Sequence, residues 1–236
     1  MNIVVTGVSR GIGYELVKLL STDSQNTVLA VSRNVKKLEQ LKKECLLANA
    51  SSKVVPIVCD LSDSIAITRL VSVIPQHVSS VNILINNAGT IVNKPFTEIS
   101  ITDLQRVYTV NVFAIVQLIQ QLLPLMSTKQ KAHVVNIGSM GGFQGSAKFA
   151  GLSVYTSSKA ALACLTECLA EEFKDKNIAF NCLALGAAQT EMLNEAFPGY
   201  KAPLTAEEMA TYIAQFSLTA HQYINGKTIP VSLSTP

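Results

Sequence analysis

Tyr155 and Lys159 are the two residues whose types and spacing could do chemistry. They stand four residues apart in a segment, Leu152–Phe173, that is rich in helix formers, so a helix places both side chains on one face. A tyrosine has a pKa of about 10, and an ammonium one turn away favours the phenolate and lowers that pKa. The pair therefore indicates a proton donor and acceptor.

The alternative to a chemical role is a structural one, in which the tyrosine packs in the core beside a lysine whose ammonium group reaches water. The predicted helix carries an apolar stripe through Tyr155, Lys159, Leu162, Thr166, Leu169 and Phe173. A lysine on such a face needs a partner or a function, because an unpaired buried charge is costly. On the pair alone both interpretations stay open, and the rest of the chain decides between them.

A glycine-rich turn lies between a predicted first strand, Asn2–Thr6, and a predicted helix over Ile12–Leu20. Its residues are Gly7, Val8, Ser9, Arg10, Gly11, Ile12 and Gly13. Glycines at this point let the backbone approach a pyrophosphate at a helix N-terminus. The spacing G-x-x-x-G-x-G differs from the commoner G-x-G-x-x-G. The position of the turn directly after the first strand is therefore the main support for a dinucleotide site.

Arg33 follows the second predicted strand, Thr27–Ser32, where dinucleotide-binding proteins select their cofactor. An acidic residue near this point holds the ribose 2′-hydroxyl of NAD, whereas an arginine accommodates the 2′-phosphate of NADP. Here the residues are Ser32 and Arg33, with Arg10 as a second cation. These residues predict NADP(H) as cofactor, and a solvated loop arginine is the alternative for Arg33.

Strand and helix patterns alternate along the chain without a linker or repeat. The remaining strands are predicted over Val54–Cys59, Val81–Asn86, Ala132–Gly138, Ala179–Leu185 and Lys227–Val231, and the remaining helices over Val35–Leu47, Asp63–Ile74, Thr102–Leu123 and Thr205–Leu218. The 236 residues are 48% hydrophobic and 15% charged, which suits a buried parallel sheet. We predict one α/β domain over residues 1–236, a Rossmann-like doubly wound parallel sheet of about seven strands with helices on both faces.

Composition argues against several partners. The net charge of +3 and the scattered basic residues give no signature of nucleic-acid or membrane-surface binding. We find no stretch long and apolar enough to span a bilayer and no signal peptide, because the first predicted strand starts at the second residue, so we expect a cytoplasmic protein.

No metal site is predicted, and Cys164 and Cys168, which share a helical face, are expected to be buried.

Several motifs together resemble the short-chain dehydrogenase/reductase family, of the NADP-preferring type, almost from end to end of the chain. TGVSRGIG resembles the family's cofactor loop, Cys59-Asp60-Leu61 its adenine site, Asn86-Asn87-Ala88-Gly89 its NNAG motif, and YTSSK its Y-x-x-x-K. Asn111 and Ser139 fall where the family's other two active-site residues are expected. Asn111 also lies on an apolar stripe of Leu104, Val107, Ala114, Leu118 and Leu122, where a buried amide must be hydrogen-bonded.

The resemblance implies hydride transfer from a nicotinamide to a carbonyl carbon. Tyr155 would protonate the oxygen, Ser139 would hydrogen-bond it, and Lys159 would lower the pKa of Tyr155 and hold the nicotinamide ribose. Asn111 would hold a water leading to the lysine, with local backbone bonding as the alternative. The implied cofactor contacts are Gly7, Ser9, Arg10, Gly11, Ile12, Gly13, Arg33, Asp60 (to the adenine amino group), Leu61, Asn87, Ala88, Gly89, Tyr155, Lys159, Gly186 and Thr190.

Three departures from the family pattern stand out. Leu185 replaces the usual proline before Gly186, the C-terminus reads GKTIPVSLSTP without the usual Asp-Gly-Gly, and the loop from Met140 to Val154 is longer than in many relatives. A substrate lid is expected over about residues 190–218. Met140, Phe143, Phe149, Met192, Phe197 and Tyr200 could line an apolar pocket or serve as ordinary packing.

These observations predict an NADPH-dependent reductase of a ketone or aldehyde, reversible as an alcohol dehydrogenase. A 3-oxoacyl thioester is the most familiar substrate class for this motif set, and the partner expected is a small carbonyl or alcohol. The helices bearing Asn111 and Tyr155 often pair across a two-fold in relatives, so we expect a homodimer, with a tetramer left open. The alternative is an NADPH-binding regulatory or structural protein of the same fold without turnover.

Overall fold

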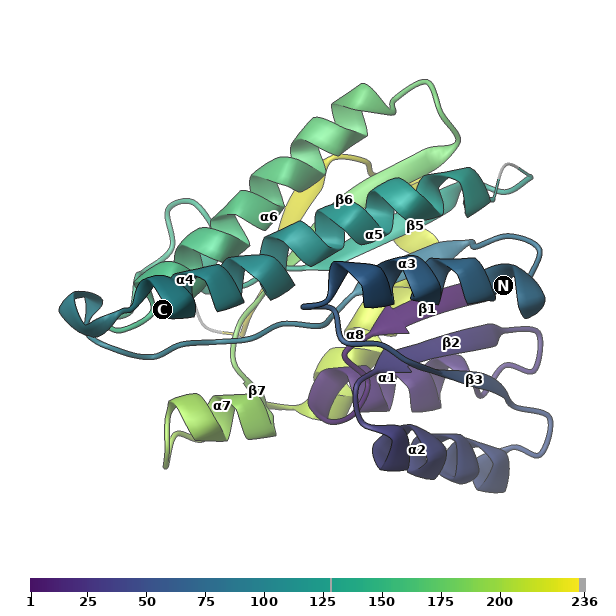
Figure 1. Ribbon diagram of the computed structural model, residues 1–236, viewed down its shortest axis with the longest axis horizontal. Helices are drawn as coiled ribbons and strands as arrows, with labels where there is room; N and C mark the ends of the chain where they lie inside the picture. The colour runs from purple at the N-terminus through teal and green to yellow at the C-terminus, as the bar shows by residue number, and fades with distance from the viewer. Residues whose placement is uncertain (128, 234–236) are drawn as a thin grey trace.

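Runs of β-branched residues form seven strands of one parallel sheet in the computed structural model, which describes residues 1–127 and 129–233 (Figure 1). The strands are β1 (Asn2–Thr6), β2 (Thr27–Ser32), β3 (Lys53–Val58), β4 (Ile83–Asn86), β5 (Ala132–Ile137), β6 (Ile178–Leu185) and β9 (Lys227–Val231). Their order is β3-β2-β1-β4-β5-β6-β9, and each neighbouring pair is parallel. The order reverses between β1 and β4, the point at which such sheets bind ligands. The predicted fold class is confirmed.

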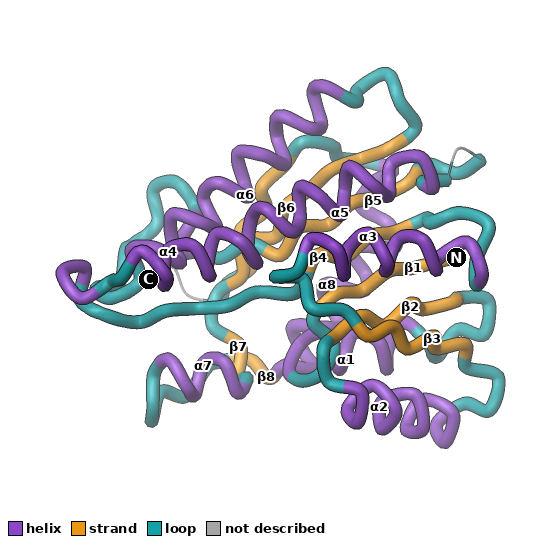
Figure 2. Tube along the Cα trace, in the orientation of Figure 1, coloured by secondary structure: helices purple, strands orange, loops and turns teal. Residues whose placement is uncertain are grey.

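Helices cover both faces of the sheet (Figure 2). One face packs on α1 (Gly11–Leu20), α2 (Val35–Ala48) and α8 (Ala206–Thr219), and the other on α3 (Ser64–Val73), α5 (Ala114–Leu122) and α6 (Ser153–Glu172). Along β1, Ile3 and Val5 join the first apolar cluster while Val4 joins the second. Side chains of a strand alternate between faces, so a sheet covered on both sides requires the continuous apolar runs seen in the sequence.

Local capping fixes the start of two helices. α4 (Ile101–Tyr108) begins with a capping box in which Ser100 and Asp103 bond each other's backbone N–H groups. Thr205 and Glu208 do the same for α8. Each box satisfies two donors that a helix otherwise leaves open, which explains why the helix starts lie within two residues of their predicted positions.

The helix predicted over Thr102–Leu123 is interrupted. A π turn, Thr109–Phe113, separates α4 from α5, and Asn111 lies fully buried within it. Leu104, which lies before the π turn and is expected on the buried stripe, is 36% exposed, while the other stripe residues on both sides of the turn are buried as predicted.

Residues Ile101–Leu125 are long and apolar enough, by length and composition alone, to cross a membrane, contrary to the expectation that the chain has no such stretch. The same test is passed by the core helix of a globular domain. Here Ile115, Leu118 and Leu122 are buried in the cluster that packs on the sheet. The segment's apolar character is accounted for by that packing.

The segment after β6 contains elements that the sequence did not predict. Two short strands, β7 (Ala188–Gln189) and β8 (Leu204–Thr205), pair with each other, and α7 (Glu191–Ala196) lies between them. Of the expected lid over residues 190–218, the part that follows Thr205 is α8, whose Met209 and Ile213 are buried in the core. The part that lies outside the core is residues 190–203, which we call the lid segment.

Both edge strands of the main sheet contain a proline. Pro56 in β3 lies opposite Ala30 of β2, and Pro230 in β9 lies opposite Ala184 of β6. Proline lacks a backbone N–H and is therefore tolerated in a sheet chiefly at its edges.

His133 in β5 is a fully buried histidine at the end of the sheet away from the glycine turn. Its Nδ1 lies 2.9 Å from the Ser217 carbonyl oxygen, and its Nε2 lies 3.0 Å from Asn181 Nδ2. The ring therefore donates through Nδ1 and accepts through Nε2, which is the neutral form. Burial is the main cause that lowers the pKa of His133 to about 4, with the charges of His221 and Lys131 acting the same way.

We expect acid to destabilise the protein through His133. Between pH 6.5 and 4 the unfolded chain binds a proton that the folded chain excludes, so the free energy of unfolding falls as pH is lowered, by about 3 kcal/mol over that range. His133→Gln should be less stable at pH 7 and should lose this part of the pH dependence in urea unfolding. The exposed-site control His77→Gln should keep it, and a His133→Gln variant with the wild-type slope would contradict the assignment.

Candidate active site

The turn between β1 and α1 is packed so closely that its glycines are required. Gly7 has a φ of +74°, and a Cβ there would lie 2.7 Å from Ala88 Cα. A Cβ on Gly13 would lie 2.4 Å from both Asn87 Nδ2 and Gly7 O. Arg10 precedes α1 without a side-chain hydrogen bond to the helix start. The N-terminus of α1 thus keeps open backbone donors beside a glycine cradle, the arrangement that binds a pyrophosphate.

The end of β4 holds this turn in place at the switch point of the sheet. Asn87 Nδ2 donates to the carbonyl oxygens of Thr6 and Gly7, at 3.0 and 3.1 Å. The backbone N–H of Ala88 donates to Thr6 Oγ1 at 3.1 Å. The glycine turn and the NNAG segment, 80 residues apart in sequence, are therefore one rigid unit.

A chain of buried polar side chains braces the sheet below this unit. Asn86 Nδ2 donates to Asn136 Oδ1 at 2.8 Å, and Asn136 Nδ2 donates to Thr166 Oγ1 at 2.9 Å. The three residues come from β4, β5 and α6 and are fully buried. Such bonds fix the register of their elements, because breaking one would leave a buried polar atom without a partner.

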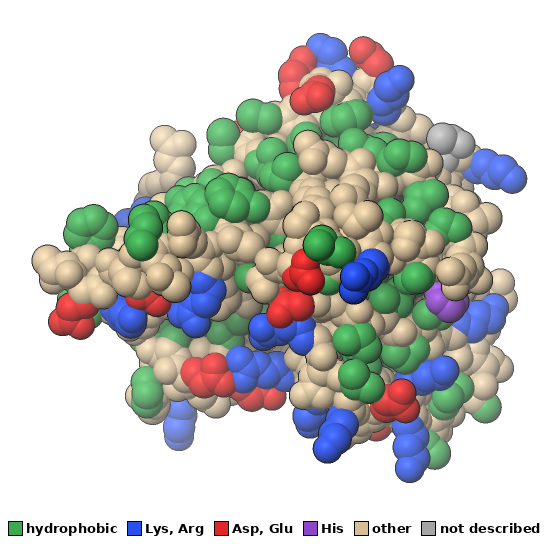
Figure 3. All heavy atoms as spheres, in the orientation of Figure 1, with side chains coloured by type: hydrophobic (Ala, Val, Ile, Leu, Met, Phe, Trp, Pro, Cys, Tyr) green, Lys and Arg blue, Asp and Glu red, His purple; other side chains and the backbone are tan. Residues whose placement is uncertain are grey.

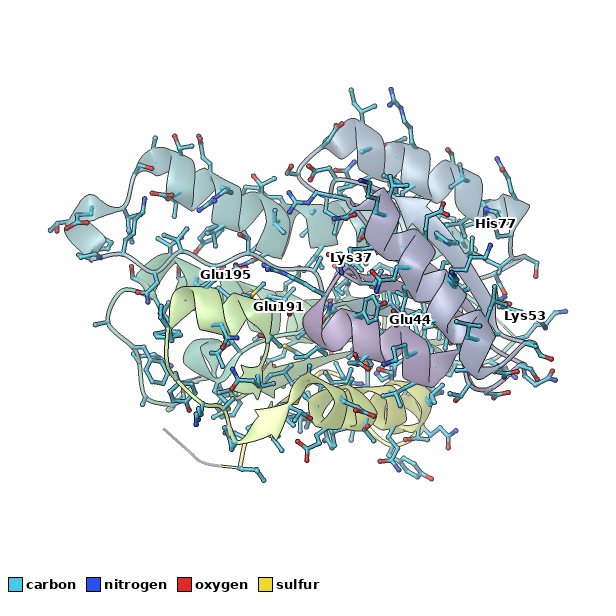
Figure 4. All side chains as sticks on the ribbon, turned by 90° about the horizontal axis from the view of Figure 1, so that it is seen from below. Lys37, Glu44, Lys53, His77, Glu191 and Glu195 are labelled. Atoms are coloured by element: carbon cyan, nitrogen blue, oxygen red, sulfur yellow. The ribbon has the colours of Figure 1, made fainter. Side chains whose placement is uncertain are left out.

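A cleft of about 1030 Å³ opens beside the glycine turn, between α1, α2 and the first turn of α7. Figure 4 shows Lys37, Glu44 and Glu191 around it. Its cations are Arg10, Arg33, Lys36 and Lys37, and its acidic residues are Glu15, Glu44 and Glu191. The two arginines that the sequence predicted for a 2′-phosphate thus line the same cleft.

Asp60 and Leu61 follow β3 at the edge of this region. Asp60 Oδ1 accepts hydrogen bonds from the Ser62 N–H at 2.9 Å and from its hydroxyl at 2.7 Å, and Oδ2 lies 3.8 Å from Arg33 Nη1. Burial acts to raise the pKa of Asp60, but the Ser62 hydrogen bonds and the Arg33 charge together hold that pKa below its usual value. Leu61 belongs to the core cluster that contains α3 and α5.

Tyr155 and Lys159 lie on the sheet-facing side of α6. Lys159 Nζ is 5.9 Å from the centre of the Tyr155 ring and donates to the Ile137 carbonyl at 2.7 Å. The lysine side chain is almost fully buried, and burial lowers its pKa to about 8. Ser139, after β5, hydrogen-bonds the Tyr155 hydroxyl.

The predicted lowering of the Tyr155 pKa is wrong for the chain by itself. Burial of the phenol raises the pKa of Tyr155, and the hydrogen bond from Ser139 opposes this only in part. The sequence could place Lys159 on the same helical face, but it could not show that the ammonium bonds the Ile137 carbonyl instead of the phenol. At neutral pH the phenol therefore holds its proton, which is the state that a proton donor needs.

Asn111 is fixed by three hydrogen bonds from neighbouring elements. Its Oδ1 accepts from the Thr90 N–H at 2.9 Å, and its Nδ2 donates to the Thr90 carbonyl at 2.9 Å and to Ser158 Oγ at 3.0 Å. A Cβ on Gly89 would lie 3.5 Å from both Asn111 Oδ1 and Lys159 Nζ, so the two side chains flank this glycine. The side chain of Asn111 is thus committed to joining the β4 loop to α6.

The lid segment lies against the glycine turn. A Cβ on Gly11 would lie 3.3 Å from Thr190 Cγ2 and 3.5 Å from Glu191 Oε2. Thr190 caps α7 through a hydrogen bond from the Leu193 N–H. Gly186 is packed against Ser232, whose Oγ would be 2.5 Å from a Cβ at that position. This close contact restrains Gly186 directly after Leu185, the last residue of β6, which is paired with Val231 of β9.

The residues expected to line a substrate pocket differ in burial. Met140 is buried, whereas Phe149 and Tyr200 are exposed and the other three are half-buried. Met140 therefore packs in the core, and the other five residues remain candidates for the wall of the substrate site.

Sequence reasoning missed the residues that hold the site residues in place. Thr90 and Ser158 fix Asn111, Thr6 Oγ1 fixes Ala88, and Glu195 pairs with Arg10. Thr6 and Ser158 stand inside the cofactor-loop and Y-x-x-x-K motifs, and their hydroxyl oxygens accept from the Ala88 N–H and from Asn111 Nδ2, so their place in these motifs is the signal that the sequence offers. Thr90 and Glu195 carry no local signal, because their partners lie 21 and 185 residues away.

Cys164 and Cys168 are exposed, not buried as expected. α6 buries Leu162, Thr166 and Ala170, and residues two positions from these face the opposite side of a helix.

The residues present fit a dinucleotide. The glycine cradle admits no Cβ at Gly7 or Gly13, and the start of α1 offers free N–H donors. The cleft beyond it offers two arginines on the side where such folds hold the adenosine ribose. The ammonium of Lys159 lies next to Gly89, in the segment that holds the cradle, and with it stand the Tyr155 phenol and the Ser139 hydroxyl. The arrangement can bind an anionic cofactor and pass a proton to an oxygen held next to it.

Comparison with known proteins agrees with this geometry. The family model described as short chain dehydrogenase matches residues 1–201. The chain is 29% identical to an NADP-dependent 3-hydroxy acid dehydrogenase of Schizosaccharomyces pombe, covering 94% of this chain and 88% of the relative. It is 31% identical to a fatty acyl-CoA reductase of Acinetobacter baylyi, covering 89% and 70%. The solved NADP complex of Pseudomonas aeruginosa RhlG superimposes with a TM-score of 0.84 at 28% identity, covering 98% and 94%.

We expect Lys159→Met to stabilise the fold. Holding the ammonium in the core costs free energy below pH 8, and this cost fades as pH rises toward 10.5, where the unfolded chain also loses its proton. The variant should gain about 1–3 kcal/mol at pH 7 in denaturant unfolding, since the lost bond to Ile137 offsets part of the gain. The gain should shrink at pH 10. Lys42→Met, on the exposed face of α2, should leave the free energy of unfolding unchanged at both pH 7 and pH 10. A Lys159→Met variant that is less stable than wild type at pH 7 would contradict the costly burial of the ammonium.

Proposed function

The chain belongs to the short-chain dehydrogenase/reductase family of oxidoreductases, and we propose that within it the protein is an NADPH-dependent reductase of ketone or aldehyde carbonyls. The observation that carries the proposal is the meeting of Tyr155, Ser139 and Lys159 beside the glycine cradle. A binding protein without turnover has no need of a protonated phenol and a buried ammonium at that place.

NADP(H) would be held from the adenosine end to the nicotinamide end by residues of five loops. Gly7, Ser9, Gly11, Ile12 and Gly13 would bind the pyrophosphate, and Arg10 and Arg33 the 2′-phosphate. Asp60 and Leu61 would contact the adenine, Asn87, Ala88 and Gly89 the adjoining ribose, and Gly186 and Thr190 the nicotinamide end. This cofactor is supported by two relatives, because the dehydrogenase is named as NADP-dependent and RhlG was solved with NADP.

The chemistry follows from what each side chain can donate. When bound, NADPH supplies the hydride. Ser139 donates a hydrogen bond to the substrate carbonyl oxygen and stabilises the charge that develops there. Tyr155 delivers its proton to the same oxygen, and the raised pKa keeps that proton in place until it is needed. Lys159 holds the nicotinamide ribose with its ammonium, and Asn111 keeps the β4 loop and α6 at a fixed separation.

The proposed substrate is an acyl compound whose reacting carbonyl lies close to an apolar chain, such as a 3-oxoacyl thioester or a 3-oxo acid. The names of the two relatives, a 3-hydroxy acid dehydrogenase and a fatty acyl-CoA reductase, support this class. Half-buried Phe143, Met192 and Phe197 suit an apolar chain.

Tyr155→Phe should lower turnover by a factor of about 10²–10⁴, because it removes the proton donor, while NADPH binding should stay within about threefold. The measurement is NADPH consumption against ketones, aldehydes and 3-oxoacyl thioesters, with binding followed by nicotinamide fluorescence. Tyr223→Phe, at a tyrosine 82% exposed, is the matched control and should behave as wild type. Full activity in Tyr155→Phe would exclude its role. Tight NADPH binding with no turnover on any substrate would favour a regulatory or structural protein.

We further propose that the protein forms a homodimer through α4, α5 and α6. Ile101, Leu104 and Phe113 expose 67, 36 and 59% of their surface along α4 and the π turn that follows it. Figure 3 shows hydrophobic side chains gathered along α5 and α6 on the face it presents. Large exposed apolar patches are typical of interaction sites, and the exposed Cys164 and Cys168 lie on α6 as well.

Phe113→Glu should convert a dimer into a monomer, because it places a charge in the apolar patch. Sizing with light scattering should give twice the mass of one chain for wild type and one chain mass for the variant. Leu47→Glu, at an exposed leucine on α2, should leave the mass unchanged. A monomeric wild-type protein would rule the proposal out.

A further inference from the structure

α7 makes polar contacts at its carboxyl end with distant parts of the chain, and its apolar residues are only half-buried. None of its six residues, Glu191–Ala196, is buried. Within the described residues, two polar contacts join it to parts of the chain that are distant in sequence: Glu195 forms an ion pair with Arg10 of the glycine turn, and the Ala196 carbonyl accepts a hydrogen bond from Asn93 Nδ2 at 2.8 Å. A helix attached in this way can move without disturbing the core.

The Arg10–Glu195 ion pair is bidentate. Arg10 Nη2 donates to Glu195 Oε2 at 3.1 Å, and Arg10 Nη1 donates to Oε1. The side chains are 45% and 61% exposed, so water screens the attraction and the pair can exchange for another anion. Figure 4 shows Glu191 and Glu195 together on α7, beside the amino end of α1.

The same guanidinium is one of the two cations proposed for the 2′-phosphate of NADP(H), and this step rests on that proposed function. The terminal fork of an arginine matches one bidentate acceptor at a time. A phosphate monoester carries a charge of about −1.5 to −2 near neutral pH. Placed between Arg10 and Arg33 it would repel the carboxylates of Glu195 and Glu191 and outcompete a single negative charge for the fork.

We propose that Glu195 is a specificity-determining residue that occupies Arg10 until a 2′-phosphate displaces it. The displacement frees one of the two distant ties of α7 and leaves the bond from Asn93 to the Ala196 carbonyl as a pivot. A cofactor with a 2′-phosphate thus releases the lid segment. With NADH, which lacks the 2′-phosphate, Glu195 stays paired with Arg10 and the lid segment stays attached. Glu195 thereby couples the identity of the cofactor to access through the lid.

The test uses adenosine fragments, so that it does not depend on turnover. Calorimetry with 2′,5′-ADP and with 5′-AMP is run on wild type, Glu195→Gln and the exposed control Glu172→Gln. Glu195→Gln should bind 2′,5′-ADP about two- to fivefold more tightly, the range set by an exposed ion pair, with 5′-AMP unchanged. In an Arg10→Gln background the same substitution should have no effect.

A fluorescent reporter follows the lid directly. The chain has no tryptophan, so Phe197→Trp, one residue after α7, places a single fluorophore at the helix end. Its emission should shift on addition of 2′,5′-ADP and not of 5′-AMP, and in the Glu195→Gln background it should be shifted before any ligand is added.

Three results would overturn the proposal: weaker or unchanged 2′,5′-ADP binding by Glu195→Gln, an equal gain for 5′-AMP, or a gain that persists without Arg10. Measuring NADPH and NADH binding by the wild-type protein distinguishes a failure of the Glu195 displacement from a failure of the proposed function. A protein that binds neither, or prefers NADH, refutes the proposed cofactor, whereas a normal NADPH preference with no effect of Glu195→Gln refutes only the displacement.

Discussion

The tie between the end of β4 and the β1–α1 turn is the contact on which the rest of the site depends. Asn87 and Ala88 bond Thr6 and Gly7 directly. Two residues on, Thr90 bonds Asn111, and Asn111 bonds Ser158, one residue before Lys159. A path of hydrogen bonds joined by short backbone segments therefore runs from the glycine cradle to the part of α6 that carries Tyr155 and Lys159. Their separation is set by the backbone of one loop, which is how a site gains the preorganisation that its chemistry needs.

The same path places costly groups in the core. Lys159 and Asn111 are buried where apolar side chains would pack with less loss of hydration, and each is kept by bonds to backbone groups. Burial affects protonation as well: it raises the pKa of Tyr155 and lowers the pKa of Lys159. The proposed active site is thus a region where stability has been given up for a defined arrangement of donors.

The fold and the site differ in how far the sequence predicts them. Strands such as Lys227–Val231 and the glycine turn follow from local patterns, because a buried parallel strand and a left-handed glycine each leave a signature within a few residues. The π turn around Asn111, the exposure of Cys164, and the pairing of Glu195 with Arg10 do not, since each depends on partners far along the chain. The pKa of Tyr155 was mispredicted for the same reason: proximity on a helix is visible in a sequence, and desolvation is not.

The two prolines at the edges of the main sheet bear on how molecules of this protein meet at high concentration. An open sheet ends in rows of unpaired N–H and C=O groups that can recruit a strand from another molecule and start aggregation. Pro56 and Pro230 each remove one donor from those rows, in the middle of β3 and near the end of β9. Sheet-to-sheet growth into fibrils is therefore disfavoured at both borders, and contacts between copies are directed to the helical faces, where they can be finite and symmetric.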